Sequence, residues 1–516
     1  MTSRRHSLGL AMAALLLAGC ANVDPRRGFP AVEEDARQRL GANLAWSQDA
    51  EEDAAIRAQV SRLLAQPLSP DVAVQIALLQ NPDLQATYEA LGVAAADLVQ
   101  AGLLSNPVLV AAPRPGVGSV SGTNLELDIA QNLLQLLTLR SRKELATRQF
   151  EEARLRVSHQ VIELAAEVRD AWYERVAALH LLSVLRSIEE TASLASEYAT
   201  RLHRAGNVSN LALARERALF EEARIARQNA EAAAIAPREQ LARLLGRRPP
   251  QALETPETLP PLPAMRVRSE GLEALALANR LDLRALEKEI EAFEQALALA
   301  RFYRWIPFVE VGVSAEREAE GGWVVGPQLA LEIPIFDQGQ AQVARFESMV
   351  RERRRHHEAL LLDVRRDVRT FSEAVRARRH LAEEYLRTLI PLRERIVRLT
   401  QAEYNYMLVG AFELLSAKRD EIASYEQYVE ALRRYWVSRA GLERAVGGAL
   451  PTEPAEPAEA EAAPEPLAVP GIEPDADDHG AHGDHGGSGH GAHAPEAPPE
   501  KRAPSGHHHH EGHDGE

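Results

Sequence analysis

Cysteine is almost absent from this 516-residue chain, which contains one, Cys20. No disulfide can therefore form within the chain, and its stability must come from packing and assembly. Long apolar runs are absent as well, since no stretch approaches the about 20 uncharged apolar residues of a transmembrane helix. If the chain crosses a membrane, it must do so as strands of a closed barrel, because open strand edges stay unsatisfied in lipid.

Proline and glycine are scarce between Leu139 and Gly246, where Gly206 is the one interior glycine and Pro237 is the first proline. The stretch consists mostly of Ala, Leu, Glu and Arg, which are strong helix formers. A helix from Ser141 to Ala205 would be on the order of 100 Å long and needs partners along its length. A 4-3-4-3 spacing predicts the seam for such a partner: Val157, Val161, Leu164, Val168 and Ala171.

The chain repeats this pattern between about Asp337 and Gly447, with one mid-stretch glycine, Gly410. A plain coiled coil would explain one copy, but the duplication favours two long helical hairpins that turn at Gly206 and Gly410. The repeat extends upstream, because residues 77–86 resemble 276–285 and Pro107 corresponds to Pro307. A period of about 200 residues indicates a doubled domain and excludes a short solenoid repeat.

The N-terminus has the pattern of a signal peptide, with Arg4 and Arg5 before an apolar run from Leu8 to Gly19. The sequence Leu17-Ala18-Gly19-Cys20 resembles a bacterial lipobox. This resemblance implies cleavage before Cys20 and acylation of its thiol, with palmitate as a typical chain. Ala21 in place of Asp implies sorting to the outer membrane.

Four segments alternate between apolar and polar residues as membrane-barrel strands do. In the second half, one segment begins at Val309 and another at Trp323. In the first half, one segment lies near Leu125 and a weaker one runs from Val108 to Ala112. Four strands cannot close a barrel, for which about eight are needed, so several chains must share one. Four acids would then face the lumen and make it cation-tolerant: Glu126, Asp128, Glu310 and Glu332. A half-buried soluble hairpin remains the alternative interpretation of these strands.

Together these segments resemble a TolC-type outer-membrane efflux factor over about residues 40–450. Three pieces carry the resemblance: Asn81-Pro82-Asp83-Leu84, Leu104-Ser105-Asn106-Pro107, and the run from Leu331 to Gly339. The resemblance implies a mainly α chain that trimerises, with four strands per chain in a shared 12-stranded membrane β-barrel. The duplicated hairpins would form an α-barrel tunnel across the periplasm. The run from Leu331 to Gly339 is similar to the second strand-to-helix junction of the family. The equivalent residues of the first half, 129–137, depart from that pattern.

The resemblance also implies partners. The hairpin tips at Gly206 and Gly410 would meet a periplasmic adaptor protein and an inner-membrane pump of the RND type. Glu413 falls at the first of two acidic gate positions of the family, whereas Ser416 departs at the second. A solvated turn glutamate is the alternative for Glu413. The expected organisation is a signal peptide (1–19), a lipidated segment and belt (20–67), two repeats (68–265 and 266–450) and a tail (451–516).

The tail is rich in Pro, Ala, Glu, Gly and His, which predicts disorder. It has a net charge of −13 (15 acids against Lys501 and Arg502), so the body accounts for only −3 of the chain's −16. Imidazole is a common ligand of Zn, Cu and Ni, which predicts metal binding by the tail, with adventitious binding as the alternative. Its ten histidines are His479, His482, His485, His490, His493, His507, His508, His509, His510 and His513.

No nucleophile, phosphate loop or paired-carboxylate constellation is apparent, so we expect neither an enzyme nor a required cofactor nor a nucleic-acid partner. The leading hypothesis is a lipid-anchored outer-membrane duct of a tripartite pump for heavy-metal cations. The same duct could instead serve drugs or other organic solutes. A periplasmic metal-buffering lipoprotein, with its helices as a scaffold, is the third hypothesis.

Overall fold

The computed structural model describes residues 23–115, 123–247, 254–317 and 321–454. All of them belong to one compact unit. Cys20 and the ten tail histidines lie outside the described residues.

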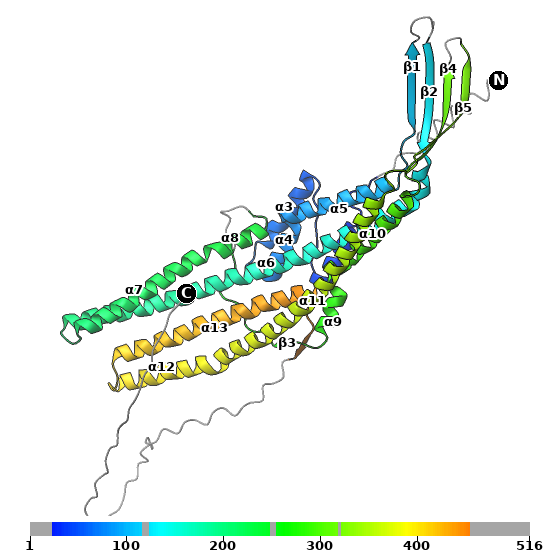
Figure 1. Cartoon of the computed structure of the whole chain (residues 1–516). Helices are drawn as coiled ribbons and strands as arrows, with labels where there is room; N and C mark the ends of the chain where they lie inside the picture. The colour runs from blue at the N-terminus through cyan, green and yellow to red at the C-terminus, as the bar shows by residue number, and fades with distance from the viewer. Residues whose placement is uncertain (1–22, 116–122, 248–253, 318–320, 455–516) are drawn as a thin grey trace, which may run out of the picture. The chain divides into compact units, whose positions relative to one another are not determined.

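The first hairpin is built on α6 (Leu133–Arg204), which has 72 residues and is roughly 110 Å long. Asn132 caps its start, since its side chain accepts a hydrogen bond from the backbone N–H of Gln135. The chain turns at Gly206, whose φ is +76°, and returns as α7 (Asn210–Ala233) and α8 (Ile235–Leu244). The predicted hairpin is therefore present, and its first helix starts several residues earlier than expected (Figure 1).

The second hairpin runs out along α11 (Gln340–Glu384) and α12 (Ile390–Asn405) and returns as α13 (Ala411–Val446). A π-helical turn, η1 (Tyr385–Leu389), separates α11 from α12. Pro391, the second residue after this turn, lacks the N–H that an α-helical turn would use. The π-helical turn is wider than an α-helical turn and lets the helix continue despite this missing donor. The described residues of the first hairpin contain no π-helical turn.

Each half places a broken helix pair before its strands. In the first half α4 (Pro70–Gln80) meets α5 (Pro82–Ala101), and in the second α9 (Leu272–Asn279) meets α10 (Leu281–Tyr303). The breaks have the same geometry, with ψ of 122° at Asn81 and 116° at Arg280, as the internal repeat predicts. Two further helices, α2 (Phe29–Leu40) and α3 (Ala50–Leu63), precede the first pair.

Four antiparallel strands form one sheet in the order β1-β2-β4-β5, with bounds Val108–Pro115, Thr123–Asn132, Val309–Arg317 and Trp323–Leu331. The central pair, β2 and β4, joins the two halves. Gly312 allows this close approach, because a Cβ there would lie 2.5 Å from the carbonyl oxygen of Ile129. A separate two-stranded sheet pairs β3 (Met265–Val267) with β6 (Thr452–Pro454), the last described residues.

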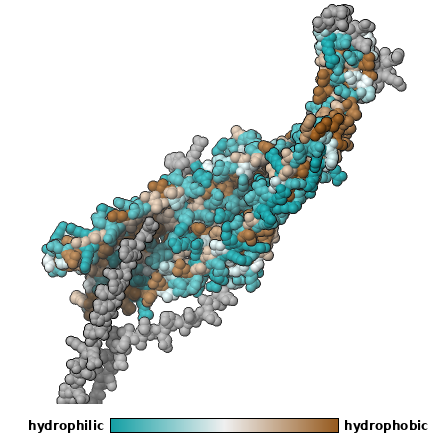
Figure 2. Space-filling model, viewed as in Figure 1, coloured by the Kyte–Doolittle hydropathy of each residue, from teal (hydrophilic) through white to brown (hydrophobic). Residues whose placement is uncertain are grey.

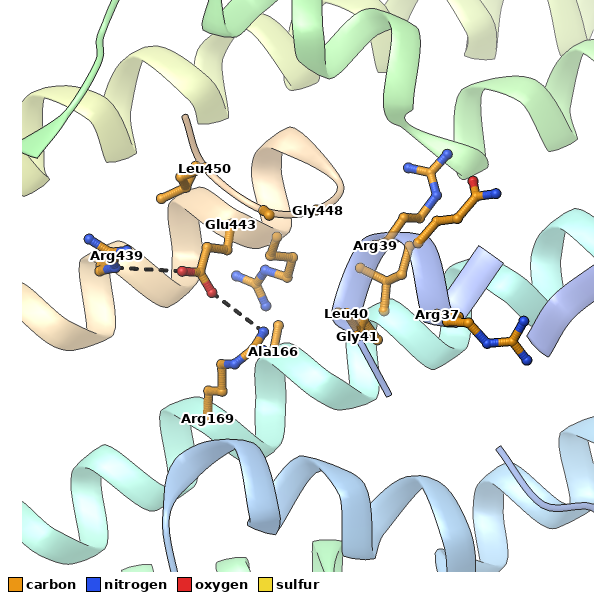
Figure 3. Close-up of a pocket in the computed structure, with 14 residues that line it drawn as sticks. Arg37, Arg39, Leu40, Gly41, Ala166, Arg169, Arg439, Glu443, Gly448 and Leu450 are labelled. Carbon is orange, nitrogen blue, oxygen red and sulfur yellow. Dashed lines mark ion pairs between the residues drawn. The ribbon is translucent and has the colours of Figure 1, made fainter. Parts of the chain in front are cut away.

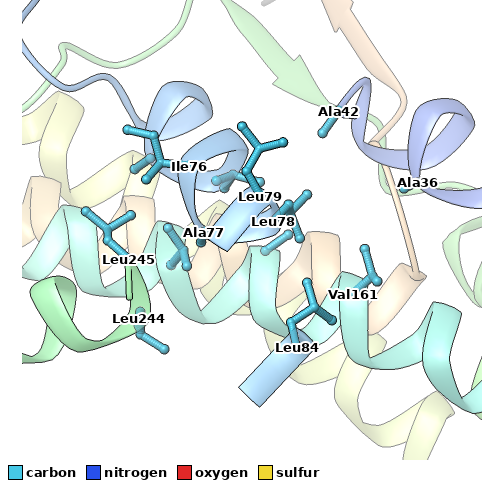
Figure 4. Close-up of a cluster of buried hydrophobic side chains, with 14 of the residues drawn as sticks. Ala36, Ala42, Ile76, Ala77, Leu78, Leu79, Leu84, Val161, Leu244 and Leu245 are labelled. Carbon is cyan, nitrogen blue, oxygen red and sulfur yellow. The ribbon is translucent and has the colours of Figure 1, made fainter. Parts of the chain in front are cut away.

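The core lies where α4, α5 and α8 pack on α6 (Figure 4). The predicted seam is part of it: Val157, Val161 and Val168 are buried, as is Ala171, and Leu164 is partly buried. Trp172 anchors the same region, since its Nε1–H donates to the carbonyl oxygen of Leu68 at 2.7 Å. Among the described residues, no helix combines the length and the apolar character needed to span a membrane.

Candidate functional site

The sheet carries three of the four predicted lumen acids on one face. Glu126 and Asp128 of β2 point to the same side as Glu310 of β4, because the register pairs Glu126 with Glu316 and Asp128 with Ser314. Glu332 lies one residue beyond the end of β5, so it extends this face but is not part of the strand. Glu316 is a further acid of this face, which a longer reading of the Glu310 alternation would have found.

One basic side chain moderates this charge. Arg114 of β1 forms an ion pair with Glu126 of β2. Glu126 lies directly opposite Glu316 of β4, which has the same charge. Four acids and one arginine give this face a net charge of −3 per chain over the strands. The face therefore favours cations over anions along the sheet.

The opposite face of the sheet is apolar. Cross-strand pairing aligns Leu109, Ile129 and Val313 in one row, and Val311 lies opposite Leu329 in another. All five side chains are exposed within the chain. Strands β1 and β5 each pair on one side only among the described strands, so the sheet has two open edges. An exposed apolar face beside open edges is typical of a sheet that is completed by other molecules.

The two hairpins end in different turns. Gly206 has the left-handed conformation expected of a glycine helix stop. Gly410 does not: its φ is −86° and its ψ is 161°, and it precedes α13 as the capping residue. The left-handed position is taken by Met407, with φ of +58°, three residues earlier. The expectation that Gly410 turns the chain as Gly206 does was therefore wrong, although Gly410 does lie in the turn.

Large apolar side chains occupy the end of the second hairpin. Tyr406, Met407 and Leu408 are all strongly exposed, and Met407 is 93% exposed. Glu413 lies in the first turn of α13, is exposed, and its backbone N–H donates to the carbonyl oxygen of Gly410 at 3.1 Å. The rings of Tyr198 in α6 and Phe412 in α13 are 5.6 Å apart, so the two hairpins touch near their ends.

Farther along the hairpins, charged side chains line a hollow of about 390 Å³ between α2, α6 and the end of α13 (Figure 3). Glu443 pairs with Arg169 at 3.4 Å and with Arg439 at 3.5 Å. Burial raises the pKa of Glu443 despite these two partners. The hollow therefore holds an ionic network between the two halves of the chain.

Asp170 is a neighbour of this network on α6. Burial raises the pKa of its carboxyl from 3.8 to about 7, Arg444 opposes the shift, and Glu174, Glu167 and Glu443 add to it. No local pattern in the sequence could have found this group, because the part of α13 that packs beside it is about 270 residues away in the chain. Asp170 is thus a carboxyl that titrates near neutral pH at the contact between the two hairpins.

Among the described residues, no group of three or more His, Cys, Asp or Glu side chains could hold a metal ion. The predicted metal ligands of the tail and the predicted lipid attachment site, Cys20, lie outside those residues. The described part of the chain thus offers surfaces and an acidic face rather than a ligand cage.

Comparisons with known protein families and with solved structures both find outer-membrane proteins. A family model described as outer membrane efflux protein matches residues 73–247. The CmeC outer membrane channel of Campylobacter jejuni is similar in structure, with a TM-score of 0.64 and 14% identity over 74% of this chain and 86% of that one. The MtrE outer membrane channel of Neisseria gonorrhoeae gives 0.60 and 19% over 73% and 88%.

A CusC structure, described in terms of folding and transmembrane channel formation, gives a TM-score of 0.61 and 17% identity over 76% of this chain and 92% of that one. At these identities the structural likeness concerns the fold alone. A search of curated protein sequences finds no significant match.

Proposed function

We propose, from the premise that this chain belongs to the outer membrane efflux protein family, that it is the outer-membrane exit duct of a tripartite efflux pump. Members of this family are channels rather than enzymes. The sheet is the observation that carries the proposal: four strands with one acidic face, one exposed apolar face and two open edges.

The open edges support a homotrimer. Three chains would supply 12 strands, enough to close a barrel in which β1 of each chain pairs with β5 of the next. Closure would turn the apolar face to lipid and the acidic face to the lumen. The paired hairpins of three chains, α6 with α7 and α11 to α13, would continue the lumen as an α-barrel tunnel through the periplasm.

The hairpin ends are the proposed docking points. The turns at Gly206 and at residues 406–410 would contact a periplasmic adaptor and an inner-membrane pump of the RND type. Three copies of Glu413 would form an acidic ring there and act as the gate. The exposed Tyr406, Met407 and Leu408 supply the apolar surface that such a contact needs.

We assign cations as the preferred cargo because of the net charge of −3 per chain on the lumen face. The test is the reversal potential of single channels in a salt gradient. Wild type should be cation-selective, and Glu126→Gln with Glu310→Gln should reduce that selectivity, whereas the matched control Glu51→Gln on exposed α3 should not. Unchanged selectivity in the double variant would favour the second candidate, a duct for organic solutes.

The tail and the N-terminus complete the proposal. Cys20 is the proposed lipid attachment site, and the ten tail histidines are proposed to capture Zn, Cu or Ni outside the tunnel. Deleting residues 475–516 should abolish most metal binding in calorimetry and leave assembly intact, with affinity in the full chain falling below about pH 6.5. Full retention of metal binding after the deletion would refute this role.

The third candidate, a metal-buffering lipoprotein, makes a different prediction. Such a scaffold would be released from membranes once both the signal peptide and the lipid anchor are absent. A duct would still require detergent, because its apolar sheet face would lie in lipid.

A further inference from the structure

Exposed apolar side chains gather where the four strands meet the helices, and we call this set the apolar collar. It includes at least one residue from each of the four strand–helix junctions: Leu104, Leu137, Trp305, Ile333, Ile335 and Phe336. Phe336 is 92% exposed and Trp305 is 75% exposed. Figure 2 shows the brown, hydrophobic surface concentrated at the foot of the strands. Side chains of this size are rarely left in water together without a function.

The polar groups of the same junctions are bonded to one another. The hydroxyls of Tyr303 and Thr138 are 2.8 Å apart, which ties the end of α10 to the start of α6. Gln131 donates from Nε2 to the carbonyl oxygen of Ser105 at 2.9 Å, which ties β2 to the segment before β1. These four polar side chains are therefore at least partly buried within the junctions, while the large apolar side chains of the collar are exposed.

Basic side chains follow the collar on its helical side. Arg140 pairs with Glu144 at 3.0 Å and Arg301 with Glu347 at 2.7 Å. Lys143, Arg304 and Arg345 have no carboxylate within 4 Å among the described residues, and neither does Arg142, whose Nη1 is buried. Lys143 is about 15 Å from the start of α6 and Arg345 about 8 Å from the start of α11, by helical rise.

Arg304 connects the two features. Its guanidinium lies 5.6 Å from the centre of the Trp305 ring, a cation–π contact. Gly339, at the start of α11, lies close against the backbone of Arg304. An apolar surface that passes directly into unpaired cations matches the boundary between acyl chains and phosphates.

We propose that this collar and three of its unpaired cations bind anionic phospholipids of the leaflet that faces the helices. Acyl chains cover Trp305, Ile335 and Phe336, and headgroup phosphates contact Arg304, Lys143 and Arg345. The inference rests on the proposed membrane location but adds a lipid class and the residues that select it.

A second copy of the chain is a poorer occupant. The collar draws on all four junctions, whereas within the strand layer of a closed barrel a neighbour would pair only along the β1 and β5 edges. Lysine is also depleted at protein interfaces, and Lys143 is exposed beside the collar. Lipid fits both observations.

The first test measures tryptophan quenching by brominated phospholipids, with the full chain reconstituted in nanodiscs. Trp46 and Trp172 are buried and Trp436 is partly buried against the core, so Trp305→Phe and Trp323→Phe separate the signals of the two exposed indoles. We expect lipid quenching of both Trp305 and Trp323, the latter in β5. Quenching of Trp323 alone would overturn the collar proposal. Trp305 would then face water, if water-soluble quenchers reach it, or lie under a neighbouring chain, if they do not. Quenching of neither would instead refute the membrane location.

The second test measures which lipids stay bound. Native mass spectrometry of protein from mixed phosphatidylglycerol and phosphatidylethanolamine nanodiscs should show enrichment of phosphatidylglycerol. Removing charge in Lys143→Gln, Arg304→Gln and Arg345→Gln should lower this enrichment by up to about fivefold per residue. The matched triple control Arg57→Gln, Arg387→Gln and Arg395→Gln changes exposed cations outside the collar and should leave it intact. Equal enrichment in both triple variants would overturn the proposal.

Discussion

Asp170→Asn should stabilise the chain increasingly as pH rises from about 4 to about 7. Burial and three nearby acids raise the pKa of the carboxyl from 3.8 to about 7 in the folded state. The folded chain therefore holds this proton more tightly than the unfolded chain, and wild-type stability falls as pH rises from about 4 to about 7. The difference between the two pKa values corresponds to about 4 kcal/mol per chain, as an upper limit because the side chain is only partly buried.

Asparagine cannot ionise, so the gain in Asp170→Asn should be near zero below about pH 4 and should reach its full value above about pH 7. Thermal unfolding followed by circular dichroism from pH 4 to 8.5 measures it. Glu190→Gln, an exposed acid on the same helix, is the control and should show no pH-dependent gain. A gain of equal size at all pH values would refute the argument, since it would reflect packing rather than ionisation.

Three further changes test local features. Gly206→Ala should destabilise the first hairpin end by about 1 kcal/mol, because its φ is +76°, whereas Gly410→Ala should cost less, because Gly410 has a negative φ and loses only its N-cap preference; hydrogen exchange of the two turns compares them directly. Gly312→Val should prevent assembly, because its Cβ would collide with the Ile129 carbonyl between β2 and β4, and size-exclusion chromatography in detergent would show the loss. Cys20→Ser should abolish fatty-acid labelling; unchanged labelling would place the acyl chain elsewhere.

The sequence predicted what depends on local periodicity. Alternation marked three of the four strands, β1 was found as a weaker apolar run, and the scarcity of glycine and proline marked both hairpins. The parallel breaks at Asn81 and Arg280 follow from the internal repeat. The spacing of Val157, Val161 and Val168 marked the buried seam of α6. In each case the physical signal lies within a few residues of the feature.

The features that were not predicted depend on contacts between residues far apart in the chain, or on a non-glycine residue in a left-handed conformation. Met407 takes the left-handed position of the second turn, where residue preferences point to Gly410. The exposure of Ile335 and Phe336 depends on how the junctions pack, and both lie in a run that was interpreted only as a family motif. Glu316 was missed because the alternation was not followed to the end of β4 at Arg317.

The central claim is that three chains close one barrel from four strands each. Native mass spectrometry of the detergent-solubilised, full-length protein tests it most directly. The account predicts a complex of three chains that persists at low protein concentration. A stable monomer that is inserted in outer membrane would contradict it, because the open edges of β1 and β5 would then remain unpaired in lipid.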